Sequence, residues 1–187
     1  MGKLGVFNFV TLDGYFQGPD GDIRWHRHDA QENEVAAEML KAGHTLLFGR
    51  VTYELMAGYW PTPDAIRNDP TVAEGMNKAE KIVFSRTLKE AAWSNTRVIG
   101  ENIEEEIRKL KQAPGKNMTV LGSGSIVTRF AQLGLIDEYQ IMVDPVVLGD
   151  GTSIFKGVNR RRNLKLTATR PLKSGSVLLS YQPAEKA

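Results

Sequence analysis

The feature that most constrains this chain is a regular alternation of strand-like and helix-like segments, which ends at Gly134. Before Gly134, short apolar runs (3–10, 44–49, 81–85, 97–99 and 117–122) are separated by segments of helical periodicity (31–43, 50–59, 71–78, 102–112 and 124–134). After it, every apolar segment is strand-like, and a turn at 173–175 predicts a hairpin between the last two. We therefore expect a three-layer α/β fold with a mostly parallel, twisted sheet of about eight strands and an antiparallel C-terminal edge.

Two segments between these elements carry loop signals. Residues 11–22 (TLDGYFQGPDGD) combine Asp-Gly and Gly-Pro-Asp-Gly turns, which indicates a long mobile loop. The chain from Trp60 to Pro70 also has the pattern of a loop. Asp29 and Glu32 have the spacing of a helix capping box, so we expect Asp29 to begin the first helix.

The composition limits the classes of function. The 187 residues suit one domain, which we expect to span residues 1–187. A net charge of +2 indicates no large nucleic-acid surface, and no apolar run approaches the ~20 residues of a membrane span. Cysteine is absent and only three histidines are present, so we expect no metal site. The N-terminal segment lacks a signal-peptide pattern, and we expect a cytoplasmic protein.

Small, hydroxyl-bearing and basic residues follow three of the predicted parallel strands. The second strand ends at Gly49-Arg50-Val51-Thr52, the third at Ser85-Arg86-Thr87 and the fifth at Gly122-Ser123-Gly124-Ser125. The carboxyl ends of parallel strands meet at one edge of a sheet, where the ligands of open α/β folds bind. We therefore expect these three turns to form one site.

The chemistry of the turns favours a ligand that carries phosphate. A helix that begins at a strand end presents unpaired N–H groups and a partial positive charge. Gly49 allows close approach of the backbone, and Thr52 places a hydroxyl in the first helical turn. Arg50 and Arg86 add charges that can each bind phosphate through two hydrogen bonds. Each turn alone is equally explained as a plain connection with solvated side chains, so the hypothesis depends on their combination.

The residues of these turns resemble the dihydrofolate-reductase-like superfamily. FGRVTYE (48–54) is similar to its Gly-Arg-x-Thr-Trp/Tyr-Glu segment, and the turns at 85–87 and 122–126 are similar to its two other NADPH-contacting turns, in the same chain order. Residues 11–25 resemble the first-strand loop that covers the nicotinamide. DPVVLGDGTSIF (144–155) is similar to a segment of the reductase domain of bifunctional riboflavin-biosynthesis deaminase-reductases. The resemblance covers nearly the whole chain and is more specific for the superfamily than for a substrate.

The resemblance implies an NADPH-dependent reductase that delivers hydride to a C=N or C=O carbon of a small heterocycle or a ribosylamino-pyrimidine. Arg50 and Thr52 would hold cofactor phosphates, Ser85 and Arg86 would meet the adenosine 2′-phosphate, and the loop from Asp13 to Gly18 would pack near the nicotinamide. The two arginines also favour NADPH over NADH, because NAD sites usually place a carboxylate near the adenosine ribose. The expected cofactor-binding residues are Gly18, Gly49, Arg50, Thr52, Ser85, Arg86, Thr87, Gly122, Ser123, Gly124, Ser125 and Ile126.

The proton donor is where the sequence departs from dihydrofolate reductases proper, which place a carboxylate on the first helix shortly after a tryptophan. Here Trp25 is followed by His26-Arg27-His28-Asp29. Asp29 and Asp13 are the candidates for the catalytic acid; Asp29 has a competing role as helix N-cap, and Asp13 as a turn residue beside Gly14. Phe16 and Trp25 are candidates to stack on a flat substrate, with core packing as the alternative.

Other readings of the sequence remain open. A nucleotide-binding sensor that holds NADP without turnover would use the same turns. A phosphate-ester binder or hydrolase would use the same anion sites. The sequence offers no lysine-bearing phosphate loop, metal cluster or nucleophile triad in support of that alternative. The basic cluster 160–162 is either a solvated loop or a contact for phosphate or nucleic acid. The resemblance further implies a homodimer formed through the antiparallel C-terminal part. The residues themselves contain no His/Cys zinc site of the deaminase kind, so we expect no deaminase half.

Overall fold

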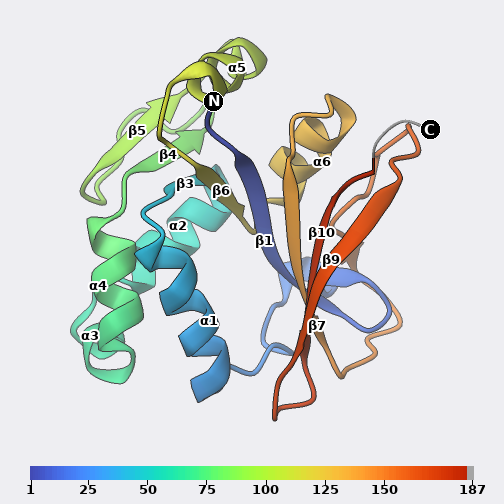
Figure 1. Ribbon diagram of the computed structural model, residues 1–187. Helices are drawn as coiled ribbons and strands as arrows, with labels where there is room; N and C mark the ends of the chain where they lie inside the picture. Colours follow the sequence, from blue (N-terminus) through green and yellow to red (C-terminus); the bar gives the residue numbers. More distant parts are fainter. Residues whose placement is uncertain (185–187) are drawn as a thin grey trace.

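The computed structural model describes residues 1–184, which build one eight-stranded sheet and one small two-stranded sheet (Figure 1). The strands are β1 (Leu4–Thr11), β2 (Tyr15–Gln17), β3 (Thr45–Gly49), β4 (Lys81–Phe84), β5 (Thr96–Ile99), β6 (Met118–Leu121), β7 (Glu138–Asp144), β8 (Thr152–Ser153), β9 (Leu164–Pro171) and β10 (Val177–Pro183). The helices are η1 (Pro19–Gly21), α1 (Ala30–Lys41), α2 (Arg50–Tyr59), α3 (Pro63–Asn68), α4 (Pro70–Lys78), α5 (Ile103–Gln112) and α6 (Gly124–Gln132).

The large sheet has the strand order β5-β4-β3-β6-β1-β7-β10-β9. The strands from β5 to β7 pair in parallel, and β10 pairs antiparallel with both β7 and β9. The sequence prediction of eight strands, mostly parallel with an antiparallel C-terminal edge, is therefore confirmed. The order places the carboxyl ends of β3, β4 and β6 next to one another.

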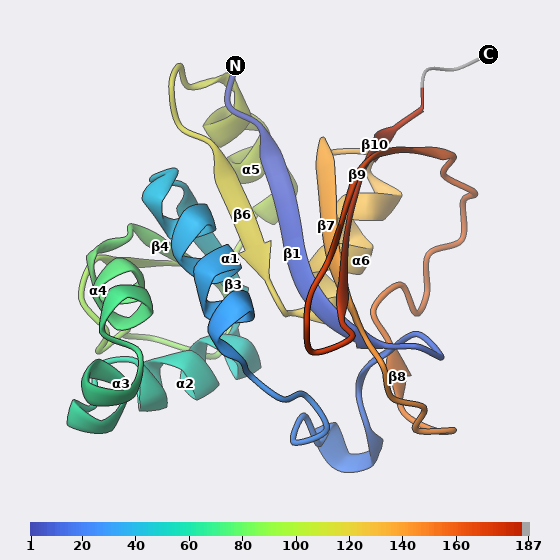
Figure 2. The ribbon, with the colours of Figure 1, turned by 60° about the horizontal axis from the view of Figure 1, so that its bottom comes forward.

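Helices cover both faces of this sheet. On one face, Ile107 of α5 and Phe130 of α6 are fully buried in a cluster with alternate residues of β1, among them Val6. On the other face, Val35 of α1 and Val72 of α4 pack in a second cluster that includes Phe7. Figure 2 shows α1 in front of the sheet and α5 and α6 behind it. Because β1 is buried on both faces, nearly all of its residues are apolar.

Two loop predictions were wrong. The segment 11–22 contains β2, which pairs with β8, and the short helix η1. The partners of β2 lie far along the chain, so no local pattern signals this pairing. The segment between Trp60 and Pro70 contains α3, in which the Thr62 side chain accepts a hydrogen bond from the Ala65 N–H and Pro63 occupies the first turn. The sequence pattern around Pro63 predicts a loop, but proline is also favoured at the start of a helix.

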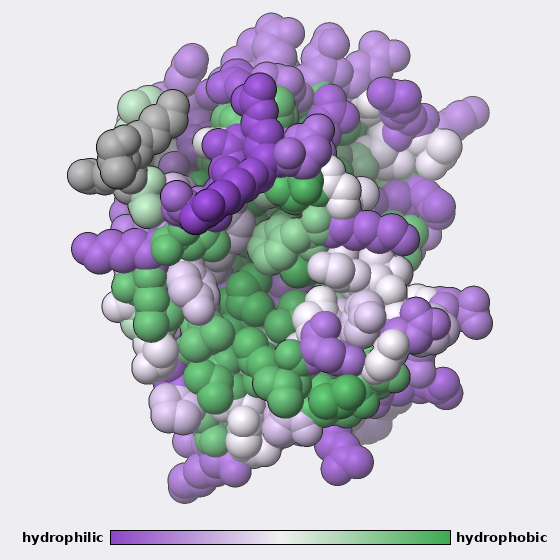
Figure 3. Space-filling model, turned by 90° about the vertical axis from the view of Figure 1, so that its right-hand side faces the viewer, coloured by the Kyte–Doolittle hydropathy of each residue, from purple (hydrophilic) through white to green (hydrophobic). Residues whose placement is uncertain are grey.

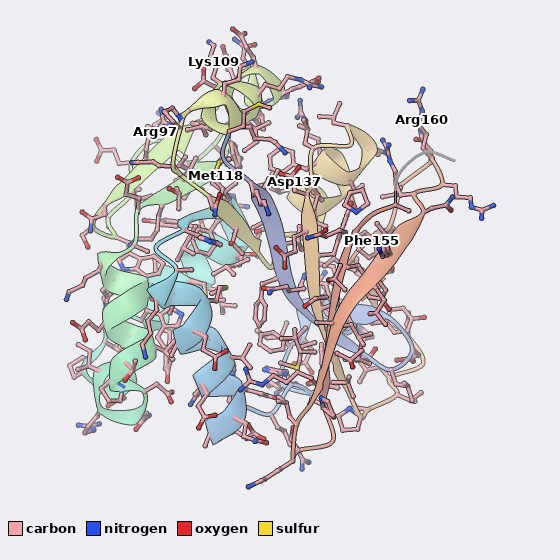
Figure 4. The ribbon with its side chains drawn as sticks, viewed as in Figure 1. Arg97, Lys109, Met118, Asp137, Phe155 and Arg160 are labelled. Carbon is pink, nitrogen blue, oxygen red and sulfur yellow. The ribbon has the colours of Figure 1, made fainter. Side chains whose placement is uncertain are left out.

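The arginines of the basic cluster have different surroundings. Arg162 donates a hydrogen bond to the carbonyl of Gln132 at the end of α6, and Arg161 donates to Asn163. Arg160 extends away from the body of the molecule in the connection between β8 and β9 (Figure 4). Arg162 thus fastens this connection to α6, which favours a structural role for part of the cluster.

None of the helices in residues 1–184 has the length and apolar character needed to cross a membrane.

Candidate functional site

An open cleft of about 1140 Å³ lies where β3 and β6 end and α2 and α6 begin. It is bordered by the first residues of both helices, by the end of β4, by the β2–η1 segment and by β8. The lining residues that the sequence predicted are Gly49, Arg50, Thr52, Ser123, Gly124, Ser125 and Phe16. Two helix N-termini thus face the same space, and their partial positive charges favour an anionic ligand there.

The turns after β3 and β6 are braced against each other. The Ser123 hydroxyl accepts a hydrogen bond from the Gly49 N–H at 2.8 Å, and the Thr52 hydroxyl accepts one from the Ser123 N–H at 3.1 Å. We had predicted that the Thr52 hydroxyl points at a phosphate. In the structure that oxygen binds the neighbouring turn, so Thr52 shapes the site through Ser123.

Close packing explains one of the two glycines of these turns. A Cβ on Gly49 would lie at ordinary contact distances, 3.5 Å from the Ser123 hydroxyl and 3.4 Å from Ile126, which is buried behind the turn. Gly122 has a φ of +55°, and a Cβ there would lie 3.0 Å from the Thr52 methyl group. Gly122 and Ile126 therefore support the cleft from behind rather than line it.

Gly124 lies in the cleft lining at the start of α6, beneath the ring of Phe16. A Cβ on Gly124 would lie 2.7 Å from the ring of Phe16, which reaches over the start of α6 from β2. Phe16 therefore lies over the predicted cofactor side of the site. Gly18, two residues later, donates its N–H to the Asp22 carbonyl and does not line the cleft, whereas Gln17 and Asp20 do.

The arginines of the site are exposed to solvent. Arg50 lies at the first position of α2 and pairs with Glu54 one turn later at 2.9 Å. Arg86 follows the end of β4 beside Phe84, which lines the cleft, but Arg86 itself does not. The Ser85 hydroxyl accepts hydrogen bonds from the N–H groups of Thr87 and Leu88, so this hydroxyl forms a tight turn.

Both predicted catalytic carboxylates are engaged in structural hydrogen bonds. Asp29 caps α1 by accepting the Glu32 N–H at 2.8 Å, the alternative role we considered for it. Asp13 accepts hydrogen bonds from the Thr11 hydroxyl and from the N–H groups of Leu148 and Gly149. These bonds, with that of Thr11 foremost, hold the pKa of the Asp13 carboxyl below its usual range, which favours the ionised form.

A buried polar cluster that the sequence did not reveal lies at the ends of β1 and β7, on the α1 side of the sheet. His26 Nδ1 lies 2.6 Å from Asp144, and His26 Nε2 lies 3.5 Å from Glu32. The Ser176 hydroxyl lies 3.2 Å from Asp144 and 3.3 Å from Glu32. The two carboxylates are only 4% and 3% exposed, respectively. Burial raises the pKa of the Glu32 carboxyl, and His26 opposes that shift.

The packing around His26 fixes its ring. His26 stacks on Phe9 with ring centroids 3.7 Å apart, and the His28 ring meets it edge-on at 4.4 Å. Trp25, which we predicted as a substrate contact, packs edge-on against His26 at 5.9 Å and does not line the cleft. The apparent capping box concealed this cluster: Asp29 caps the helix as predicted, but the Glu32 side chain points toward His26 and Ser176.

The comparison with protein families agrees with this geometry. The family described as "RibD C-terminal domain" matches residues 3–178. The chain belongs to the RibD C-terminal domain family. A relative from Bacillus subtilis (strain 168), the uncharacterized protein YyaP, is 36% identical over 172 residues, which cover 92% of this chain and 90% of YyaP.

Two solved structures have a fold similar to that of this chain. The diaminohydroxyphosphoribosylaminopyrimidine deaminase/5-amino-6-(5-phosphoribosylamino)uracil reductase from Thermotoga maritima matches with a TM-score of 0.68 and 15% identity, over 98% of this chain and 57% of that one. Dihydrofolate reductase from Enterococcus faecalis, complexed with NADP(H), matches with a TM-score of 0.64 and 18% identity, over 98% of this chain and 97% of that one. The dihydrofolate-reductase-like fold expected from the sequence is thus confirmed.

Proposed function

We propose that this chain is an NADPH-dependent reductase of the riboflavin-biosynthesis type. The observation that carries the proposal is the cleft between β3 and β6, where the N-termini of α2 and α6 face one space and are braced by Ser123 and Thr52. Dihydrofolate reductase from Enterococcus faecalis, which has a similar fold, was solved in complex with NADP(H), and this supports a dinucleotide as the ligand. Membership of the RibD C-terminal domain family supports a reductase role.

The residues around the cleft fit a dinucleotide. Gly124 and Ser125 line the cleft at the start of α6, where Ser125 adds a hydroxyl and the Phe16 ring lies over Gly124. We assign this turn to the pyrophosphate, Arg50 to a phosphate at the start of α2, and Arg86 to the adenosine 2′-phosphate. Bound NADPH would supply the hydride; the chain would hold the phosphates and cover the reacting end with the segment around Phe16.

We propose a ribosylamino-pyrimidine as the substrate class, with other small C=N or C=O compounds as alternatives. The support is the family and the activity in the name of the Thermotoga maritima enzyme, a 5-amino-6-(5-phosphoribosylamino)uracil reductase. Folate reduction proper is a weaker candidate, because the predicted acids Asp13 and Asp29 are both held in structural hydrogen bonds.

A cofactor titration followed by a turnover assay tests the proposal. NADPH and NADH are titrated by fluorescence, and loss of NADPH absorbance is then followed with 5-amino-6-(5-phosphoribosylamino)uracil, dihydrofolate and a panel of small carbonyl compounds. We expect NADPH to bind more tightly than NADH and to be oxidised with the pyrimidine. Failure of both cofactors to bind would overturn the assignment. Tight NADPH binding with no turnover on any compound would instead support the sensor.

A further inference from the structure

We propose that His26, His28 and Glu32 bind a divalent transition metal ion of the zinc class. This inference does not rest on the proposed reductase function, because none of the three residues lines the cleft. His26 and His28 lie in the segment that leads into α1, and Glu32 lies in its first turn. We expected no metal site from the sequence, because three histidines without cysteine gave no ligand spacing. The fold brings two of those histidines to one carboxylate.

The spacing of the possible ligand atoms suits a small metal ion. One atom each from His26, His28 and Glu32 lies within 4.8 Å of the other two. His26 Nε2 and Glu32 Oε2 are 3.5 Å apart. Two ligands at bond lengths of about 2.0–2.2 Å in a tetrahedral site are separated by about 3.4 Å. That pair therefore already has the required separation, and a ring nitrogen of His28 lies close enough to complete the set.

The two atoms that would bind the ion lack hydrogen-bond partners. Within residues 1–184, His26 Nε2 and Glu32 Oε2 are buried and make no hydrogen bond. Glu32 is only 3% exposed, so solvent does not supply the missing partner of its oxygen. A buried polar atom without a partner costs about 1–3 kcal/mol, and native structures contain few of them. A metal ion between these two atoms would satisfy both.

The surrounding residues orient the ligands as they do in known metal sites. The second ring nitrogen of His26, Nδ1, lies 2.6 Å from Asp144, so the Asp144 carboxylate can fix the ring and leave Nε2 free to coordinate. Ser176 lies within hydrogen-bond distance of the other Glu32 oxygen, Oε1. Phe9 stacks on the His26 ring. Asp144, His26 and Glu32 thus have the arrangement of a carboxylate–histidine–metal site.

The donor set indicates the class of ion. Two imidazoles and one carboxylate suit zinc, cobalt or another borderline transition ion, whereas magnesium and calcium prefer oxygen ligands alone. Three protein ligands leave a further coordination position for water. The metal-free alternative is a polar contact of His26 with Asp144 and Glu32, in which His28 only packs against the His26 ring.

Metal titration of the whole protein tests the site. Protein stripped with a chelator is titrated with Zn²⁺ by calorimetry and with Co²⁺ by visible absorption. We expect one ion per chain and the intense visible bands of tetrahedral or five-coordinate Co²⁺. We expect His28→Ala and Glu32→Gln each to weaken Zn²⁺ binding by more than tenfold, and Asp144→Asn to weaken it by about 10–100-fold through the His26 ring.

His44→Ala is the matched control, because His44 is the remaining histidine and bonds Thr119 away from the cluster. It should leave Zn²⁺ affinity unchanged. Circular dichroism establishes that each variant is folded; His28 is exposed, so its replacement tests the site even if the buried positions do not tolerate change. Absence of Zn²⁺ binding by the wild-type protein would overturn the proposal in favour of the metal-free cluster. Equal Zn²⁺ affinity of wild type and His28→Ala would also overturn it, because the ion would then bind without His28.

Discussion

The hydroxyl oxygen of Thr52 accepts a hydrogen bond from the backbone N–H of Ser123 at 3.1 Å. Thr52 belongs to the first turn of α2, and Ser123 precedes α6. In turn, the Ser123 hydroxyl accepts a hydrogen bond from the backbone N–H of Gly49, the residue before α2. The starts of both helices are therefore fixed relative to each other without any ligand, and a preformed site loses less entropy on binding than a flexible one.

The first prediction concerns this brace. Thr52→Val keeps the shape of the side chain and removes the acceptor, which leaves the Ser123 N–H unpaired. We expect the free energy of unfolding to fall by about 1–2 kcal/mol and NADPH to bind roughly tenfold more weakly. Urea unfolding and fluorescence titration measure the two effects. Thr52→Ser retains the hydroxyl and should restore most of the NADPH affinity; equal NADPH affinity of Thr52→Val and wild type would show that the brace does not support the cofactor site.

The second prediction concerns cofactor choice. Arg86 is exposed two residues after the end of β4, and within residues 1–184 it forms no salt bridge. We expect Arg86→Ala to weaken NADPH by ~10–100-fold and to leave NADH almost unchanged, because a charge-assisted bond to the 2′-phosphate is lost. Arg97, an exposed arginine on neighbouring β5, provides the control substitution Arg97→Ala. Equal losses for the two cofactors would remove Arg86 from the 2′-phosphate site.

The third prediction uses the contact between Gly124 and Phe16. A methyl group on Gly124 would lie 2.7 Å from the Phe16 ring, so Gly124→Ala must displace that ring. We expect weaker NADPH binding and a loss of about 1–3 kcal/mol in stability. Gly58→Ala is the control, because a Cβ there meets no atom within 4 Å; it should stabilise α2 by about 0.5–1 kcal/mol.

A double variant separates the two effects of Gly124→Ala. If displacement of the ring causes the loss, adding Gly124→Ala to a Phe16→Ala background should cost little further stability or affinity. Full additivity of the two substitutions would show instead that the methyl group itself blocks the cofactor.

The sequence predicts the parts of this molecule that depend on local patterns. Continuous apolar runs predict strands such as β1, which is buried on both faces, and small residues after them predict the turns at Gly49 and Ser123. These turns line one cleft because parallel strands end at the same edge of a sheet. The mostly parallel sheet with its antiparallel edge and the region of the site follow from such rules.

Contacts between distant residues could not be predicted in this way. Glu32 has the spacing of a capping-box residue relative to Asp29, yet its side chain meets Ser176, which lies 144 positions away. His26 meets Asp144 across 118 positions. The sequence predicts Asp13 to be a turn residue or a catalytic acid, because its hydrogen-bond partners Leu148 and Gly149 lie more than a hundred positions away: 135 and 136 residues along the chain. Only the folded structure shows which polar groups share a buried space.

The last prediction concerns assembly. We propose that the antiparallel part of the sheet forms a homodimer interface. Leu166 of β9 pairs with Tyr181 of β10, which in turn pairs with Tyr139 of β7, so these side chains share one face of the sheet. Tyr139 also packs edge-on against Phe155. Figure 3 shows an apolar area on the side of the molecule where β9 and β10 lie.

β9 is also the edge strand of the sheet. In stable proteins, an exposed edge strand is either covered by another segment or protected by charged side chains. Leu166 is 48% exposed, so Leu166→Glu should leave the fold intact and raise the dimer dissociation constant by more than tenfold, because a charge would be buried at the interface. Light scattering after size-exclusion chromatography measures the mass of each species. Ile66→Glu on α3, which is 51% exposed on another part of the surface, is the control and should leave the mass of the wild-type species unchanged. A wild-type protein that elutes with the mass of one chain, or a Leu166→Glu variant that remains dimeric, would place the interface elsewhere or exclude it.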